Sequence, residues 1–322
     1  MTRPLVYFTA AVCLLGIAQA GAQDRPQQQP APVFRGRGDA VRVFATVTDR
    51  DGRLVTTLTQ AEFEVRDEGK PQPIVLFDNS PQPIRLVVMF DVSGSMEGNL
   101  PLLRAAAEQL FTRLRPDDRV RVGAFGHDVD ISPTFTNDPH VLRRDLPEAI
   151  AADAPTPLWR AIDEGIDAFG DDRDMRRVVL VLSDGKDSGP TSFRQRFVSQ
   201  GEVLDRARDT DTMVYAIGMR SRGSRPAGGG IGPGGLQAML TQDLPDPGLA
   251  RVAEESGGGY TEIRFGQDLG AAFAAVADEL HSQYLLGFAP PKRDGKAHDI
   301  EVRVNQRGLK PRARKQYVAP KA

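Results

Sequence analysis

The sequence predicts an α/β protein built on a doubly wound, mostly parallel sheet, with a small flanking β domain. Between residues 84 and 282, short apolar segments alternate with segments whose apolar residues recur at helical spacing, which is typical of a parallel sheet covered by helices. The first apolar segment, residues 84–90, reads as a strand covered on both faces. Strand-like segments in residues 39–83 and 283–322 are each too small to bury a core. We therefore expect these two segments to form the flanking domain together.

Residues 1–22 have the features of a secretory signal peptide. Arg3 precedes an apolar run, and small-residue triplets end at Ala20 and Ala22, which are candidate cleavage positions. The run is too short for a membrane span, so we expect cleavage after Ala22 or Ala20 and a periplasmic or secreted protein without a transmembrane span. The single cysteine, Cys13, lies in this run, and the mature chain would therefore hold no disulfide.

The remaining elements follow in chain order after residues 23–38, whose Gln, Pro and Arg content predicts a disordered linker. The expected strands are residues 41–49, 58–70, 73–78, 84–90, 120–125, 129–135, 178–182, 212–217, 259–263, 282–289, 298–304 and 312–318. The expected helices are residues 102–114, 141–150, 158–169, 203–208, 249–255 and 269–281. The glycine-rich segment 219–246 interrupts this alternation and predicts a loop. It either borders the site described next and contacts a partner, or is a disordered insertion that touches nothing.

Oxygen-bearing side chains gather where the predicted strands end. Asp91, Ser93 and Ser95 directly follow the strand at 84–90, and Asp184 follows the strand at 178–182. Thr156 stands before the helical pattern at 158–169. In open α/β sheets ligands bind outside the carboxyl ends of the strands, and a set of oxygen ligands suits a hard cation such as Mg²⁺. The alternative for the serines is that they only cap the following helix.

Together these five residues resemble the complete metal-ion-dependent adhesion site of the von Willebrand factor A (VWA) family, whose sheet is Rossmann-like. The resemblance implies that Ser93, Ser95 and Thr156 coordinate the metal directly. It implies that Asp91 and Asp184 do so directly or through water, and that the ion is Mg²⁺, Mn²⁺ or Ca²⁺. The segment before residue 84 and the tail Q-Y-L-L-G-F followed by R-A-R-K-Q-Y further resemble a secreted bacterial "VWFA-related" family.

The resemblance implies a non-enzymatic binding protein whose metal ion engages an Asp or Glu of a protein partner, as in adhesion. The alternative is a structural or envelope-assembly module in which the metal only stabilises the loops. Catalysis is not expected, because the four histidines are scattered and His127, the one nearest a strand end, reads as an exposed turn residue. A formal net charge of −2 argues against nucleic-acid binding. The basic residues of the tail alternate with valines and read as the solvated face of strands.

Overall fold

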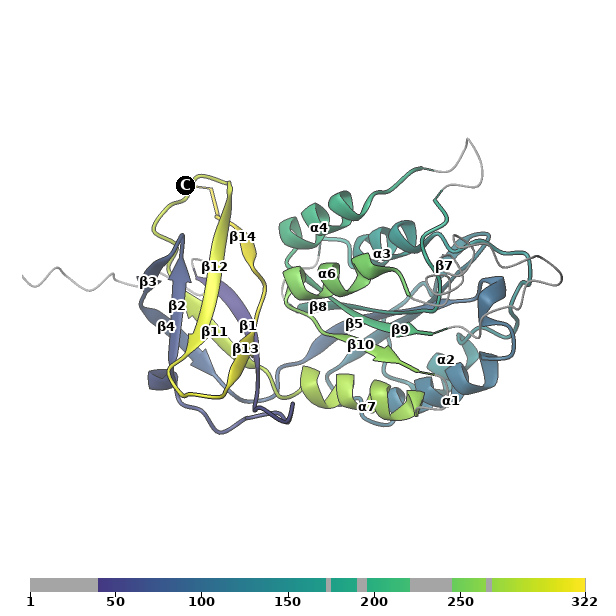
Figure 1. The fold of residues 1–322 in the computed structure, drawn as a ribbon, viewed down its shortest axis with the longest axis horizontal. Coiled ribbons are helices and arrows are strands. Elements are labelled where there is room, and N and C mark those ends of the chain that lie inside the picture. Colours follow the sequence, from purple (N-terminus) through teal and green to yellow (C-terminus); the bar gives the residue numbers. More distant parts are fainter. Residues whose placement is uncertain (1–39, 172–174, 190–195, 221–244, 265–267, 322) are drawn as a thin grey trace, which may run out of the picture. The chain divides into compact units, whose positions relative to one another are not determined.

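The computed structural model describes residues 40–171, 175–189, 196–220, 245–264 and 268–321. The expected signal peptide, the linker and most of the glycine-rich segment 219–246 lie outside the described residues. The described residues belong to one compact unit, which contains the central sheet and two smaller sheets (Figure 1).

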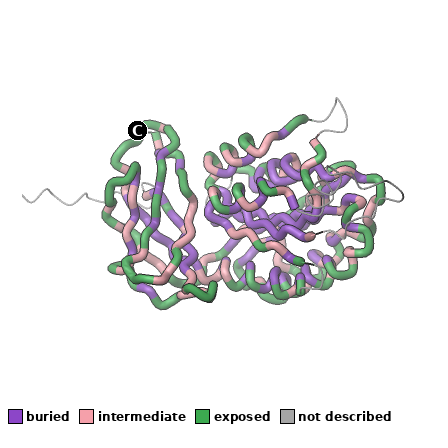
Figure 2. The backbone as a smooth tube through the Cα atoms, in the orientation of Figure 1, coloured by how far each residue is buried: buried purple, intermediate pink, exposed green. Residues whose placement is uncertain are grey.

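The central sheet has six strands in the order β10-β9-β8-β5-β6-β7. Five of them run parallel and β7 pairs antiparallel with β6, so the prediction of a mostly parallel sheet is confirmed. Buried residues fill this sheet (Figure 2). Its strands are β5 (Ile84–Asp91), β6 (Arg119–Phe125), β7 (Val129–Ile131), β8 (Arg176–Ser183), β9 (Thr212–Met219) and β10 (Tyr260–Ile263).

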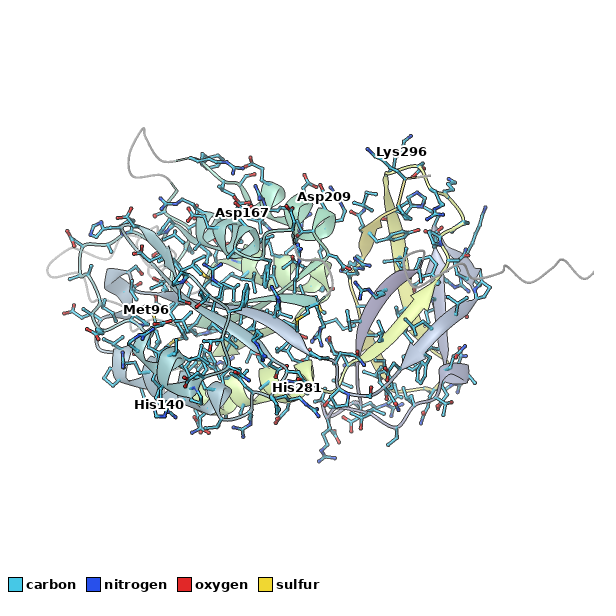
Figure 3. All side chains as sticks on the ribbon, turned by 180° about the vertical axis from the view of Figure 1, so that it is seen from behind. Met96, His140, Asp167, Asp209, His281 and Lys296 are labelled. Carbon is cyan, nitrogen blue, oxygen red and sulfur yellow. The ribbon has the colours of Figure 1, made fainter. Side chains whose placement is uncertain are left out.

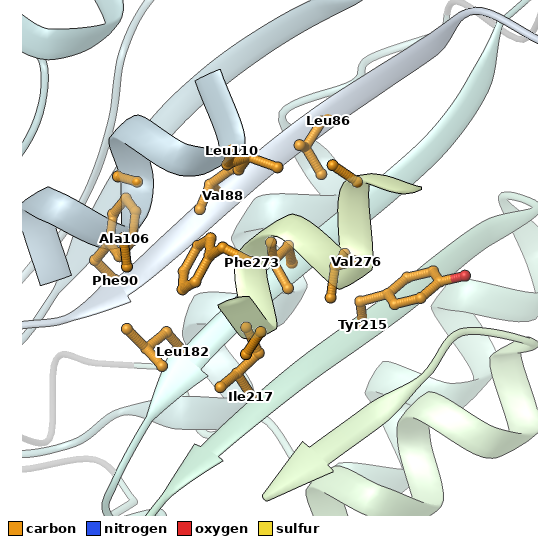
Figure 4. Packing of buried hydrophobic residues seen from close by; sticks show 14 of the residues in the cluster. Leu86, Val88, Phe90, Ala106, Leu110, Leu182, Tyr215, Ile217, Phe273 and Val276 are labelled. Carbon is orange, nitrogen blue, oxygen red and sulfur yellow. The ribbon is translucent and has the colours of Figure 1, made fainter. Parts of the chain in front are cut away.

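Helices cover both faces of the central sheet because successive residues of its strands point to opposite sides. On β5, Leu86, Val88 and Phe90 pack with α1 and α7, whereas Val87 and Met89 pack on the side of α3, α4 and α6. Figure 4 shows the first of these layers. The helices are α1 (Leu100–Phe111), α2 (Pro139–Arg144), α3 (Leu158–Asp167), α4 (Gln200–Asp209), α6 (Pro247–Ser256) and α7 (Leu269–Leu280), with 3₁₀ turns η1 (Gln60–Glu62) and η2 (Gly94–Met96).

The strands before and after the central sheet pair with one another in two four-stranded antiparallel sheets. One has the order β13-β1-β11-β4 and the other β14-β12-β2-β3, and they share a buried core that includes Val43, Phe63, Tyr284 and Tyr317. The flanking β domain therefore uses both ends of the chain, as the sequence predicts. Its strands are β1 (Val41–Thr48), β2 (Phe63–Asp67), β3 (Lys70–Gln72), β4 (Ile74–Asp78), β11 (Tyr284–Phe288), β12 (Ala297–Val304), β13 (Lys310–Arg312) and β14 (Gln316–Val318).

Three elements differ from expectation by more than their end residues. The strand expected at 58–70 is the turn η1 followed by β2, and Lys70 already begins the separate strand β3. The helix expected at 141–150 is the short α2, which ends at Arg144, a few residues before Pro147. The strand expected at 312–318 is two strands, because β13 pairs with β1 in one sheet and β14 pairs with β12 in the other. The chain crosses between the two sheets within that segment, and strand-like composition alone does not show such a crossing.

Candidate metal centre

The end of β5 holds Asp91 in a fixed orientation. Its side chain is fully buried, its Oδ1 accepts a hydrogen bond of 2.9 Å from the backbone N–H of Ser93, and its Oδ2 accepts one from the hydroxyl of Ser183. Ser93 then precedes the turn η2, whose Met96 is buried in the core beneath it (Figure 3). Each oxygen of the Asp91 carboxylate thus accepts one hydrogen bond from the protein, and these two bonds fix its orientation.

Gly94 allows a second loop to approach this turn closely. A Cβ atom at position 94 would lie 2.0 Å from the backbone oxygen of Ala152, so no other residue fits without moving that backbone. The N–H of Gly94 donates to the carbonyl of Ala154 at 3.3 Å, and the N–H of Ala151 donates to the carbonyl of Val92 at 3.3 Å. The loop at 151–154, which leads into Thr156, is therefore held against the turn after β5.

Asp184 joins the site from β8, the strand beside β5. Its Oδ1 accepts a 2.6 Å hydrogen bond from the hydroxyl of Ser95, and the hydroxyl oxygens of Ser95 and Ser93 lie 3.1 Å apart. Its Oδ2 is buried and has no hydrogen-bond partner. A continuous chain of contacts thus runs from Ser183 through Asp91, Ser93 and Ser95 to Asp184.

Thr156 lies beside Gly185, the residue that follows Asp184 in the chain. A Cβ atom at Gly185 would be 2.9 Å from the Thr156 hydroxyl oxygen. The backbone N–H of Thr156 donates to the Ser188 hydroxyl at 3.1 Å, and the N–H of Ser188 donates to the Thr156 carbonyl at 2.9 Å. The structure therefore brings all three segments that carry the five sequence-predicted residues to one edge of the sheet.

The electrostatics of the site favour a cation. Burial raises the pKa of Asp91 to about 6, even though the hydrogen bonds from Ser183 and Ser93 lower it, and burial also raises the pKa of Asp184. Taking a carboxylate out of water disfavours its charged form, and a cation at the site would reverse this effect. The described residues contain no group of three or more His, Cys, Asp or Glu side chains that could hold a metal, so a cation here would rely on hydroxyl oxygens beside two carboxylates. These residues, with the free Oδ2 of Asp184, fit a hard cation.

Ser183 is the residue that sequence reasoning missed. It lies directly before Asp184 in the segment L-S-D-G, and as the last residue of β8 it is fully buried. A serine closing the apolar run at 178–182 is the signal that could have identified it. His127 is exposed, as the sequence indicates, and its Nε2 lies 3.2 Å from Oδ1 of the exposed Asp153.

Comparison with known proteins found a family match that includes the candidate metal centre, and several similar solved structures. Residues 86–186 match the family model of the von Willebrand factor type A domain, so the metal-centre residues all lie within the matched segment. A von Willebrand factor type A structure from Catenulispora acidiphila is 10% identical, with a TM-score of 0.47, and covers 89% of this chain and 76% of that chain. The structure of BatB from Bacteroides thetaiotaomicron is 15% identical, with a TM-score of 0.43, and the match covers 61% of this chain and 97% of that chain.

An aerotolerance-related membrane protein from Bacteroides fragilis is 14% identical, with a TM-score of 0.41, and covers 61% of this chain and 98% of that chain. A search of curated proteins found no match. VWA domains generally mediate protein–protein interactions. None of the helices in the described ranges is long and apolar enough to cross a membrane.

Proposed function

We propose that the chain is a periplasmic or secreted binding protein that holds a divalent cation and uses it to engage an Asp or Glu of a protein partner. The cation is Mg²⁺, Mn²⁺ or Ca²⁺, and Asp91, Ser93, Ser95, Thr156 and Asp184 hold it. The observation that carries the proposal is the buried, unpartnered Oδ2 of Asp184, whose Oδ1 accepts a hydrogen bond from the Ser95 hydroxyl next to the Ser93 hydroxyl. A buried carboxylate oxygen without a partner is costly, and a cation would remove that cost.

The donor set supports a role in binding a further carboxylate. Two carboxylates and three neutral hydroxyls leave a divalent ion short of the oxygen ligands that it prefers, and Mg²⁺ in particular fills such positions with water or substrate oxygens. When bound, the ion supplies an electrophilic centre at the protein surface, where Ser95 is exposed. An Asp or Glu of the partner would approach the site from that side. Catalysis forms no part of the proposal, because His127 points its Nε2 to Asp153 in an exposed turn.

Thermal unfolding with and without Mg²⁺ tests the metal site. A ligand that binds only the folded chain raises its melting temperature by mass action, so Mg²⁺ should raise that of the parent and have no effect on Asp91→Ala. The matched control is Asp167→Ala, which removes an exposed carboxylate at the end of α3 (Figure 3) and should keep the full rise. An unchanged rise in Asp91→Ala would reject the assignment of the site.

Capture of a partner from cell-envelope extract tests the binding role. The parent should retain a protein in Mg²⁺ and release it in chelator, whereas Asp91→Ala should retain none under either condition. If Mg²⁺ stabilises the parent but no protein is captured in a chelator-sensitive way, the metal only stabilises the loops, which is the structural alternative.

A further inference from the structure

Among the described residues, the exposed charged side chains around the metal centre are mostly acidic. We call Glu97, His127, Asp128, Asp153 and Lys186 the rim; all five side chains are exposed. Three of them are carboxylates and one is a lysine. The neighbouring start of α1 adds no charge, since Pro101 and Leu102 are exposed there and Leu102 is 56% exposed.

Backbone contacts fix the acidic rim residues beside the proposed metal ligands. The N–H of Glu97 donates to the carbonyl of Gly94 at 3.2 Å, within the turn that carries Ser93 and Ser95. Asp153 lies between Ala152 and Ala154, the two residues whose carbonyl oxygens contact Gly94. The carboxylates of Glu97 and Asp153 therefore lie on segments that contact the turn η2, which follows Ser93.

His127 and Asp128 lie at a second junction with the loop at 151–154. The N–H of Gly126 donates to the carbonyl of Asp128 at 3.0 Å, and a Cβ atom at Gly126 would lie 3.2 Å from the Cβ of Ala154. His127 contacts Asp153 across this junction at 3.2 Å. Lys186 follows Asp184 by two residues and is the one lysine of the rim.

From this charge distribution we propose that the partner presents its liganding Asp or Glu within a surface rich in Lys and Arg. This inference rests on the proposed function and adds the chemistry of the partner. The two buried carboxylates would largely neutralise a divalent ion, so the charge that an approaching surface meets is the net negative charge of the rim. An acidic partner surface is repelled by it, whereas basic residues next to the liganding carboxylate are attracted. The unpartnered Oδ2 of Asp184 independently marks the centre of this face as a cation site.

Three biotinylated peptides on a sensor surface provide the probe. One carries a single Glu flanked by Lys, the second carries the same Glu flanked by Ser, and the third has the Lys flanks with Gln in place of Glu. In Mg²⁺ at low salt, the Lys-flanked Glu peptide should bind the full chain about 1.4- to fivefold more tightly than the Ser-flanked peptide for each favourable charge pair, the usual range for exposed pairs. The difference should shrink as salt is added. The Gln peptide should lose the magnesium-dependent part of the binding.

A double variant assigns the preference to the rim. Glu97→Gln with Asp153→Asn should reduce the preference for Lys flanks and keep the magnesium-dependent binding of the Ser-flanked peptide. The matched control is Asp167→Asn with Asp209→Asn, which removes two exposed carboxylates from α3 and α4 (Figure 3); it should leave the preference unchanged.

The outcomes separate this inference from the proposed function. If the Lys- and Ser-flanked peptides bind equally well and both require Mg²⁺, the basic-partner inference is wrong and the proposed function stands. The inference is also wrong if the control double variant loses the preference as strongly as the rim variant. If neither Glu peptide binds in a magnesium-dependent way, the proposed function is overturned and the inference with it.

Discussion

Replacing Asp91 by Asn should stabilise the metal-free protein while removing its response to Mg²⁺. The side chain is fully buried and burial raises its pKa from 3.8 to about 6. At pH 7 the ionised carboxylate therefore lowers the free energy of unfolding by about 3 kcal/mol, at about 1.4 kcal/mol per pKa unit. Asn is nearly isosteric and cannot ionise. Its amide can still accept from the Ser93 N–H and donate to the Ser183 hydroxyl.

The pH dependence has a defined sign. Because the pKa of Asp91 is higher in the folded metal-free chain than in the unfolded chain, the folded state binds more protons between those two values. The free energy of unfolding of the parent should therefore fall as the pH rises from 3.8 to about 6. Asp91→Asn should lack this part of the fall, so the variant gains up to about 3 kcal/mol over the parent at pH 7.5 and nothing at pH 3.5.

Urea unfolding in chelator and in Mg²⁺, at both pH values, measures these differences. With Mg²⁺ at pH 7.5 the order should reverse, because the cation stabilises only the parent. Asp167→Asn serves as the control and should follow the parent in every condition. The prediction is refuted if Asp91→Asn is less stable than the parent in chelator at pH 7.5 by more than about 1 kcal/mol, or if it keeps the parent's gain from Mg²⁺.

The remaining predictions concern packing. Gly94→Ala places a Cβ 2.0 Å from a backbone oxygen, and it should lower the free energy of unfolding by about 1–3 kcal/mol and weaken the Mg²⁺ response. The control is Gly201→Ala, whose Cβ would be 3.9 Å from its nearest neighbour. The control should change neither the stability nor the Mg²⁺ response. Glu279→Ala removes the acceptor that Thr46, Tyr215 and Arg312 share. In urea unfolding it should lower the free energy of unfolding by about 2–4 kcal/mol. Asp278→Ala, which removes an exposed carboxylate, should change the free energy of unfolding little. Deleting residues 40–83 should make the tail after residue 282 sensitive to protease, because β11 and β12 lose β1 and β2; an equally resistant tail would contradict the shared β domain.

Sequence patterns predict the central sheet well because its inner strands β5, β8 and β9 are buried on both faces. The apolar segments at 84–90 and 178–182 require no knowledge of their neighbours, and the polarity change after each one identifies Asp91 and Asp184. Parallel strands bring their carboxyl ends to one edge, so the placement of both aspartates at the same edge also follows from the sequence.

Contacts between loops could not be predicted in the same way. The approach of Ala152 to Gly94 depends on how the loop before Thr156 folds back, and no local pattern encodes that path. The hydrogen bond from Ser183 to Asp91 likewise depends on strand order and register. In the tail, the change of sheet between Arg312 and Gln316 is set by pairing with β1 and β12, which lie far away in the sequence.

The central claim is that one divalent cation is bound by Asp91, Ser93, Ser95, Thr156 and Asp184. Crystals of the full chain grown in Mn²⁺ and measured at the manganese absorption edge test it directly, because only the metal then gives a strong anomalous signal. We expect one anomalous peak within about 2.0–2.4 Å of the Ser93 and Ser95 hydroxyl oxygens, lost in crystals of Asp91→Ala. A peak at another place, or none at these oxygens in Mn²⁺, would contradict the claim.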